Sequence, residues 1–219
     1  YDWRKEHVPQ FEEEIRQYEA NGIEFFAFWN EHEKAFALFA KHGLTPQVWK
    51  TLKSPAEGGR GEKVGLAVEA MMPLAERTRA MGCKLGLYNH GGWGGEPENL
   101  VAACKVLHSH GHDHVGIVYN FHHGHGHIDD FAESFALMKP YLLCVNLNGM
   151  ADPETVKGKT NKILPIGAGK HEARMIEAIL ASGYDGPIGI LGHRFDEDVK
   201  FSLQNNLHGL EEILNTLIK

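Results

Sequence analysis

Short apolar runs alternate with longer amphipathic stretches along almost the whole chain. Each run is rich in Val, Ile, Leu and Phe, which is typical of strands that are buried on both faces. The runs cover residues 23–29, 46–52, 84–89, 115–120, 142–147, 163–166 and 188–191. This pattern predicts seven strands in a parallel sheet.

The longer stretches between these runs place apolar residues at helical spacing. They cover residues 8–20, 31–42, 63–81, 97–108, 129–138, 172–182 and 196–218. Consecutive strand ends are 21 to 39 residues apart, which is enough for a crossover helix between parallel strands. We therefore expect one α/β domain over residues 1–219, a (β/α)8-type barrel of which seven strands are visible. An open doubly wound sheet is the alternative, but Gly167-Ala168-Gly169 comes late and lacks the rest of a dinucleotide-binding motif.

Composition narrows the class of protein. The net charge of −7 is spread along the chain and provides no basic stripe, so we expect no nucleic-acid partner. No apolar run approaches the ~20 residues that span a bilayer, so we expect no membrane partner. Cys83, Cys104 and Cys144 lie far apart among apolar residues, which indicates buried free thiols and a cytoplasmic, reducing location. A leader peptide that had been removed would leave no trace here.

The 15 histidines include two clusters that the predicted strands separate. His108, His110, His112 and His114 precede the strand at 115–120, so we expect a solvated loop or an adventitious metal site there. The second cluster, His122, His123, His125 and His127, follows the same strand. In a barrel of this kind the loops after the strands build the functional face. We interpret His125 and His127 as polar loop residues, and His122 and His123 as candidates for metal binding or proton transfer.

Asparagine recurs at the ends of three consecutive predicted strands. Its amide donates and accepts hydrogen bonds without charge, which suits sugar hydroxyls, although asparagine also tolerates turn conformations. We expect substrate contacts from Asn89, Asn120, Asn146 and Asn148.

Other polar and aromatic residues lie at the same predicted mouth. Trp29 and Trp49 offer apolar surfaces for the CH face of a sugar ring. Lys50 and the pair His193-Arg194 add cations, which could bind an anionic substrate oxygen or pair with Glu31 or Glu96 instead.

The order of motifs resembles the xylose-isomerase-like TIM barrels, in the sugar phosphate isomerase/epimerase superfamily. The likeness covers nearly the whole chain and includes Gly-Ile-Glu-Phe-Phe-Ala-Phe-Trp, Lys-Leu-Gly-Leu-Tyr-Asn-His and Leu-Pro-Ile-Gly-Ala-Gly. The resemblance implies a divalent metal held by two Glu, an Asp and a His at strand ends. Those places here hold Asn89, Asn120, Asn146 and a residue near Gly192 or His193. The resemblance also implies that His123 contacts substrate.

Neutral amides bind Mg²⁺ and Mn²⁺ far more weakly than carboxylates do, so a Mg/Mn site of the family's usual kind is not expected. Imidazoles favour a transition metal such as Zn, Mn or Fe, with His122, His123 and His193 as candidate ligands. The candidate catalytic bases are His123, His90 and His193. We predict a sugar isomerase or epimerase that moves a proton next to a carbonyl. The alternatives are a non-catalytic sugar-binding relative and a lyase or hydrolase that cleaves C-glycosides or keto sugars.

The resemblance also implies that the first strand of the barrel ends just before Tyr1. We therefore expect two open sheet edges, at 23–29 and 188–191. The missing strand would come from residues upstream of Tyr1 or from a neighbouring subunit of a homo-oligomer.

Overall fold

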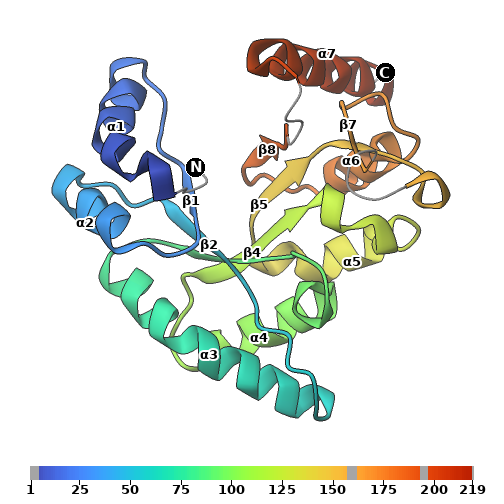
Figure 1. Ribbon diagram of the computed structural model, residues 1–219. Helices are drawn as coiled ribbons and strands as arrows, with labels where there is room; N and C mark the ends of the chain where they lie inside the picture. Colours follow the sequence, from blue (N-terminus) through green and yellow to red (C-terminus); the bar gives the residue numbers. More distant parts are fainter. Residues whose placement is uncertain (1–4, 157–161, 193–196, 219) are drawn as a thin grey trace.

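The computed structural model describes residues 5–156, 162–192 and 197–218, and strands and helices alternate along it (Figure 1). The strands are β1 (Ala27–Trp29), β2 (Gln47–Thr51), β3 (Leu85–Tyr88), β4 (Val115–Asn120), β5 (Leu142–Leu147), β6 (Gly149–Met150), β7 (Ile163–Leu164) and β8 (Ile188–Ile190). The α-helices are α1 (Phe11–Ala20), α2 (Glu33–His42), α3 (Arg60–Ala80), α4 (Pro97–Ser109), α5 (Phe131–Met138), α6 (Glu172–Ala181) and α7 (Val199–Leu217). Short 3₁₀ helices are η1 (Lys5–Gln10), η2 (Trp93–Gly95), η3 (Phe121–His123), η4 (His125–His127), η5 (Lys139–Tyr141) and η6 (Pro153–Thr155).

The main sheet of the described residues has six parallel strands in the order β1-β2-β3-β4-β5-β8. It curves, and the helices from α1 and α2 through α3 and α4 to α5 and α6 lie around its outer side (Figure 1). Strands β1 and β8 are the first and last strands in this order. They lie within the runs 23–29 and 188–191, where we expected the two edges of the sheet. The fold is an α/β barrel of the TIM type, seen here as a half-barrel, which confirms the predicted fold class.

One predicted strand lies outside the main sheet. Strand β7, within the run 163–166, pairs antiparallel with β6, while β5 pairs directly with β8. A backbone N–H of this run bonds to a helix instead of a strand: Ile166 N donates to Asn206 Oδ1 of α7 at 2.9 Å. The prediction of seven strands in one sheet is therefore wrong at this run.

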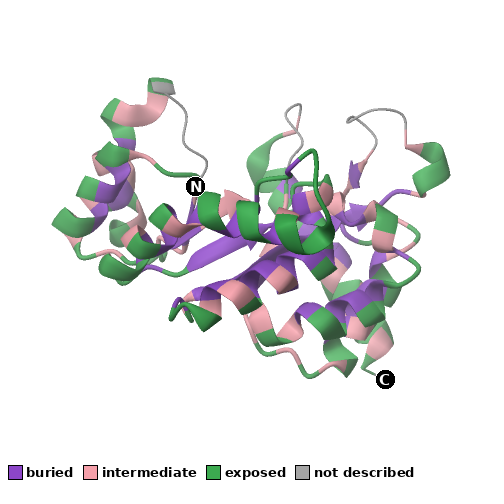
Figure 2. Ribbon diagram, turned by 90° about the horizontal axis from the view of Figure 1, so that it is seen from below, coloured by how far each residue is buried: buried purple, intermediate pink, exposed green. Residues whose placement is uncertain are grey.

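The core has two parts, one on each face of the sheet. The larger part fills the space between the sheet and the helices, and its fully buried rings include Tyr119 and Phe121. The smaller part lines the inner face and is built from Tyr88, Val118 and Cys144 with partly buried aromatic neighbours. Figure 2 shows the buried residues concentrated along the strands and on the inward sides of the helices.

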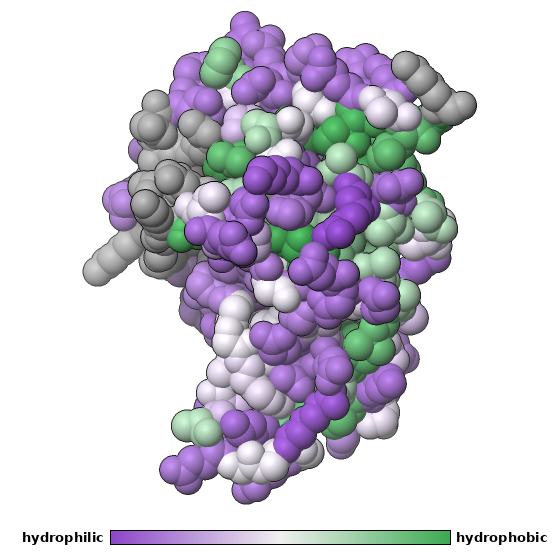
Figure 3. All heavy atoms as spheres, turned by 90° about the vertical axis from the view of Figure 1, so that its right-hand side faces the viewer, coloured by the Kyte–Doolittle hydropathy of each residue, from purple (hydrophilic) through white to green (hydrophobic). Residues whose placement is uncertain are grey.

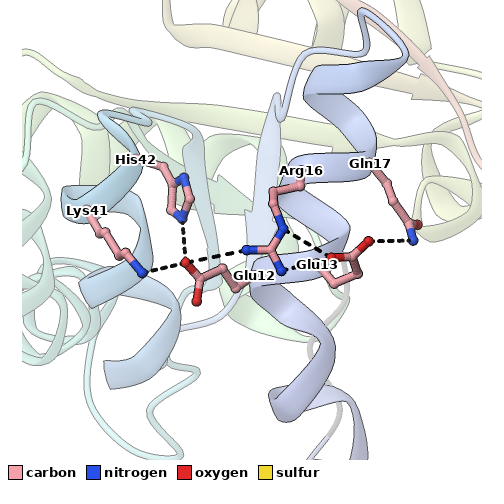
Figure 4. A network of polar contacts seen from close by, with 6 residues as sticks. All are labelled: Glu12, Glu13, Arg16, Gln17, Lys41 and His42. Carbon is pink, nitrogen blue, oxygen red and sulfur yellow. Dashed lines mark hydrogen bonds and ion pairs between the residues drawn. The ribbon is translucent and has the colours of Figure 1, made fainter.

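A polar network attaches helix α1 to helix α2 (Figure 4). Glu12 accepts hydrogen bonds from Lys41 and from His42, the latter at 3.2 Å. The hydrogen bond from Lys41, with a further one from His42, lowers the pKa of Glu12. Since these groups are solvated, the network orients the two helices rather than contributing much stability.

The three cysteines are in the state that the sequence predicts. Cys83, Cys104 and Cys144 are free and buried, and burial raises the pKa of the Cys104 and Cys144 thiols to about 12. Within the described part of the chain, no helix has the length and apolar character needed to cross a membrane. The side of the molecule that carries α7 is mainly hydrophilic with scattered hydrophobic side chains (Figure 3).

Candidate functional site

The candidate site lies where the parallel strands end, on the inner face of the sheet. The strand register pairs Trp29 with Trp49, Asn120 with Asn146, and Asn146 with Gly189. Residues in register in a parallel sheet point to the same face. The side chains of Trp29, Trp49, Asn120 and Asn146 therefore line one surface.

An aromatic and imidazole cluster forms the outer layer of this surface. The ring centroid of Tyr88 lies 4.4 Å from that of Trp29 and 5.8 Å from that of His123. The imidazole of His123 lies 4.5 Å from that of His90 and 3.5 Å from that of His122. The fold thus brings together His90, which follows β3, and His123, which follows β4.

His123 is held in its neutral form. Burial is the largest cause, and the neighbouring His122, His90, Lys162 and His125 add to it, so that the pKa of His123 falls to about 2. A neutral imidazole has one donor and one acceptor nitrogen. His90 beside it is exposed to solvent.

Asn89 has a structural role in the described geometry. Its Nδ2 donates to Asn120 O at 3.1 Å, and its Oδ1 accepts from Asn120 N at 2.8 Å. These two bonds extend the pairing of β3 with β4 by one residue. The amide of Asn89 is therefore occupied by the backbone of Asn120.

Asn120 differs from Asn89. It is fully buried, and neither Oδ1 nor Nδ2 has a hydrogen-bond partner among the described residues. A buried amide without partners costs free energy, about 1–3 kcal/mol for each unsatisfied group. This side chain is therefore the strongest indication of a missing ligand at the inner face.

Asn146 and Asn148 each use a side-chain polar atom in a hydrogen bond. Asn146 Oδ1 accepts from the Cys144 thiol at 3.6 Å, and a Cβ at Gly189 would lie 2.1 Å from the same oxygen. Only glycine fits beside this amide. Asn148 Nδ2 donates to Gly149 O at 2.9 Å, whereas its buried Oδ1 has no partner in the described part of the chain.

The predicted cation Lys50 is already paired. Its Nζ donates to Glu31 Oε1 at 2.9 Å and also to Asn30 Oδ1. Lys50 could have bound a substrate oxygen or paired with Glu31, and the geometry favours the ion pair with Glu31. Trp49 is half-buried on the inner face, where its Nε1 donates to Gln47 Oε1 at 2.9 Å. The predicted site residues His193 and Arg194 lie outside the described residues.

His127 is more than a polar loop residue, which corrects our interpretation. It lies between Glu96, 2.8 Å from its Nε2, and Asp130, 3.1 Å from its Nδ1. Burial lowers the pKa of His127, but the hydrogen bonds to Asp130 and Glu96 outweigh it, and the pKa is raised. The histidine thereby ties the loop after β3 to the loop after β4. Asp130, three residues along, was the sequence signal for this contact.

The first histidine cluster lies before β4, at the other end of the strand, as predicted. His108 Nε2 lies 2.7 Å from Val115 O, and His114 Nε2 lies 3.0 Å from Ala75 O. His112 is buried and only His110 is exposed, so the expectation of a solvated loop is wrong for His112. His108 therefore joins α4 to the start of β4, and His114 attaches the loop between them to α3.

One buried polar residue near the site, Glu172, had not been expected from the sequence. Glu172 is buried, and its carboxylate accepts from Met150 N, Gly167 N and Gly169 N at 2.9, 3.0 and 2.7 Å. Its place at the start of a predicted helix, just after a glycine-rich loop, was the available signal.

The described residues do not fit a divalent metal. The three strand ends that resemble ligand positions present neutral amides, and Asn89 has committed its amide to the backbone. No group of three His, Cys, Asp or Glu within the described ranges could hold a metal ion. Of the three predicted ligands the structure describes His122 and His123, while His193 lies outside the described residues, and zinc takes three or four protein ligands. We therefore derive no chemical step through a metal.

Comparison with protein-family models identifies one family. The family model described as xylose isomerase-like TIM barrel matches residues 3–210. No curated protein matches the sequence significantly.

Solved structures with this fold cover nearly the whole chain. A 3-keto-D-glucoside 4-epimerase from E. coli is 14% identical, with 96% of this chain and 86% of that chain covered and a TM-score of 0.64. A probable 3-DHS dehydratase from Bacillus anthracis is 12% identical, with 94% and 85% covered and a TM-score of 0.69. A xylose isomerase-like TIM barrel protein from Mycobacterium smegmatis in complex with magnesium is 19% identical, with 98% and 80% covered and a TM-score of 0.61. At these identities the likeness supports the fold and not an activity.

Proposed function

The chain belongs to the xylose isomerase-like TIM barrels, and on that premise we propose that it binds a sugar or sugar derivative at the strand ends and isomerises or epimerises it. The solved relatives include a sugar epimerase, which agrees with this class of substrate. The reaction would move a proton next to a carbonyl, without the divalent cation that the family commonly uses.

The observation that carries this proposal is the buried amide of Asn120. Neither of its polar atoms has a partner among the described residues, and Asn148 Oδ1 is in the same situation. A hydroxyl both donates and accepts, so one sugar hydroxyl can satisfy either atom of an amide. Asn146, in register with Asn120, provides a further contact from the neighbouring strand.

Aromatic rings complete the proposed sugar site. Trp29 and Tyr88 are in contact, and Trp49 lies 6.0 Å from Tyr88, all on the inner face. Such rings pack against the CH face of a sugar and exclude water from the polar groups beneath. His193 and Arg194 stay in the proposal as predicted contacts at the mouth.

We assign different roles to the two neighbouring imidazoles. His123 stays neutral at physiological pH because its pKa is about 2. It can therefore donate its N–H to the substrate carbonyl and stabilise the enediolate oxygen, but it is a poor proton acceptor. His90 is exposed and adjacent, so it takes the proton from the carbon next to the carbonyl. Return of that proton to the neighbouring carbon, with the hydroxyl proton passing to the other oxygen of the enediolate, isomerises the sugar. Epimerisation would instead need a second proton donor on the opposite face of the same carbon.

Deuterium exchange tests this proposal. Keto sugars are incubated with the protein in D₂O with EDTA present, and ¹H NMR follows loss of the signal next to the carbonyl. We expect exchange by the wild type and a reduction of about 100-fold or more in H90Q, since a general base contributes 10²–10⁴. H110A, which changes an exposed histidine of the first cluster, should exchange normally. Exchange that stops with EDTA and returns with a divalent cation would contradict the metal-free route.

A second candidate is a non-catalytic sugar-binding protein. It is favoured by the neutral amides at the strand ends and by the low basicity of His123. Sugar binding without deuterium exchange in the wild type would select this candidate. Loss of a fragment from the substrate, in place of exchange, would select a lyase or hydrolase on the same fold.

A further inference from the structure

His127 connects the two loops that carry the neighbouring imidazoles of the candidate site. The loop after β3 covers residues 89–96 and includes His90, and the loop after β4 covers residues 121–130 and includes His123. His127 Nε2 lies 2.8 Å from Glu96 Oε2 at the end of the first loop, and its Nδ1 lies 3.1 Å from Asp130 Oδ2 in the second. We call Glu96, His127 and Asp130 the loop clamp.

Only the charged form of His127 can donate to both carboxylates. A neutral imidazole has one N–H, so its other nitrogen would face a carboxylate oxygen with no proton between them. The imidazolium donates from both nitrogens, and such charge-assisted hydrogen bonds are the stronger kind. Its side chain is 24% exposed, which limits screening by solvent. Burial lowers the pKa of His127, but the hydrogen bonds to Asp130 and Glu96 outweigh it, and the pKa is raised.

The groups on the β4 side of His127 are neutral. His127 N donates to Gly124 O at 2.9 Å, and a Cβ at Gly124 would lie 2.2 Å from the hydroxyl of Tyr119, so Tyr119 lies against this turn. Burial raises the pKa of Tyr119, and the nearby carboxylates raise it further, so the phenol keeps its proton. Burial lowers the pKa of His125, two residues before His127.

The groups that α5 and α6 contribute nearby are occupied. Ser134 Oγ of α5 donates to Asp130 Oδ2 at 3.2 Å. Asp129 pairs with Arg174 of α6 at 3.2 Å. Glu96 and Asp130 are therefore the two charges that His127 meets directly within the described part of the chain.

The position of His90 depends on a loop that has little packing of its own. Its imidazole is exposed, yet its ring centroid lies 4.5 Å from that of His123. Gly91 and Gly92 follow with φ of 84° and 64°, a conformation that glycine adopts freely. A Cβ at Gly91 would meet nothing within 4 Å, so this turn can move without a clash.

The far end of this loop is drawn in two directions. Gly94 N donates to Ser54 Oγ at 2.8 Å, which attaches the loop to the segment after β2. Glu96 binds His127, which attaches the same loop to the segment after β4. The second attachment is the one that directs the loop toward His123.

We propose that His127 is a positioning residue: as an imidazolium bonded to Glu96 and Asp130, it holds the loop of His90 against the loop of His123. This rests on the proposed function, in which these two imidazoles act together, and it adds a control of that site by pH. The stabilisation by the loop clamp is complete below the ordinary histidine pKa of ~6.5, and it is lost as the pH rises through the raised pKa of folded His127. Above that pH one of the two hydrogen bonds is lost.

NMR of the protein without any sugar tests the loop clamp. The nuclear Overhauser effect (NOE) between ring C–H protons of His90 and His123 is measured below and above the pKa of His127, which the titration of its own ring signals gives. In the wild type we expect the NOE below this pKa and its loss above it. H127R, whose guanidinium stays charged, should keep the NOE at both, and H127Q and E96Q should lack it at both.

The matched control is H208Q, because His208 lies 3.4 Å from a single carboxylate, Glu212, within α7. This variant should behave as the wild type does, and thermal melting establishes that each variant is folded. An NOE that is independent of pH in the wild type and unchanged in H127Q overturns the proposal. Equal loss in H127Q and H208Q, or loss in H127R above the pKa, also overturns it.

Deuterium exchange into keto sugars separates this proposal from the proposed function. The wild-type rate should fall about ten-fold or more above the pKa of His127, and H127R should not show this fall. Ring NOEs that behave as expected, with no deuterium exchange at any pH, overturn the proposed function and leave the loop clamp standing. Exchange with the same pH profile in the wild type and H127R overturns the loop clamp and leaves the proposed function standing.

Discussion

Asn120 decides what the inner face of the barrel can bind. Its amide is the one group of the site that is fully buried with both polar atoms lacking partners among the described residues. An amide suits a hydroxyl, whereas a carboxylate in the same place would suit a hard cation. The end of β4 therefore presents a group that favours a hydroxyl over a hard cation.

Replacement of Asn120 by aspartate should create cation affinity. N120D adds an anionic oxygen at the position that resembles a family metal ligand, so we expect Mn²⁺ to bind more tightly and to raise the melting temperature of the variant. Isothermal titration with Mn²⁺ and thermal melting measure both effects. N215D, which adds the same charge at an exposed position of α7, is the control. No gain over N215D would show that Asn120 is not at the vacated ligand position.

Single residues were predicted with mixed success, for physical reasons. The strand ends could be found because buried runs stop at polar residues, and this gave Asn89, Asn120, Asn146 and His123. The sequence shows an asparagine at the end of both strands, so it could not distinguish their roles. The amide of Asn89 bonds to the backbone of the next strand, whereas the amide of Asn120 faces inward.

At the scale of elements, the segment from β6 to α6 departs most from the prediction. Its apolar run 163–166 has the composition of a strand, but the side chains of Glu172 and Asn206 satisfy its neighbouring backbone groups. A Cβ at Gly169 would lie 2.2 Å from Glu172 Oε2, so the loop closes tightly around the carboxylate. Composition indicates that a strand forms, but it does not say which strand it pairs with.

Glu172 should therefore stabilise this segment measurably. In E172Q an NH₂ replaces an acceptor oxygen and leaves a buried backbone N–H without a partner, which should cost about 1–3 kcal/mol of unfolding free energy. Urea denaturation measures the change. E177Q, at an exposed position of the same helix, should stay within about 0.5 kcal/mol of the wild type. Equal stabilities of the two variants would mean that the carboxylate does not hold the loop.

At the scale of the whole molecule, the repeated strand and helix pattern predicted an α/β barrel and left an open doubly wound sheet as the alternative. The predicted helices all exist, with bounds shifted by a few residues, and the strands β4 and β5 begin and end where predicted. The curvature places the ends of β1, β3, β4 and β5 on one inner face, and this is what brings distant residues such as Trp29 and His123 to a common ring, Tyr88. The order of the strands explains why a site spread over ~120 residues of sequence acts as one surface.

The central claim, a sugar site at the strand ends of the inner face, is tested most directly by NMR titration of labelled protein. The side-chain signals of Asn120, His90 and His123 are followed as keto sugars, sugar phosphates and sugar acids are added, with His110 as the internal control. We predict that a bound sugar shifts the Asn120 amide and both imidazoles and leaves His110 unchanged. Shifts centred on His108–His114, with the Asn120 amide unmoved by every sugar that binds, would contradict the claim.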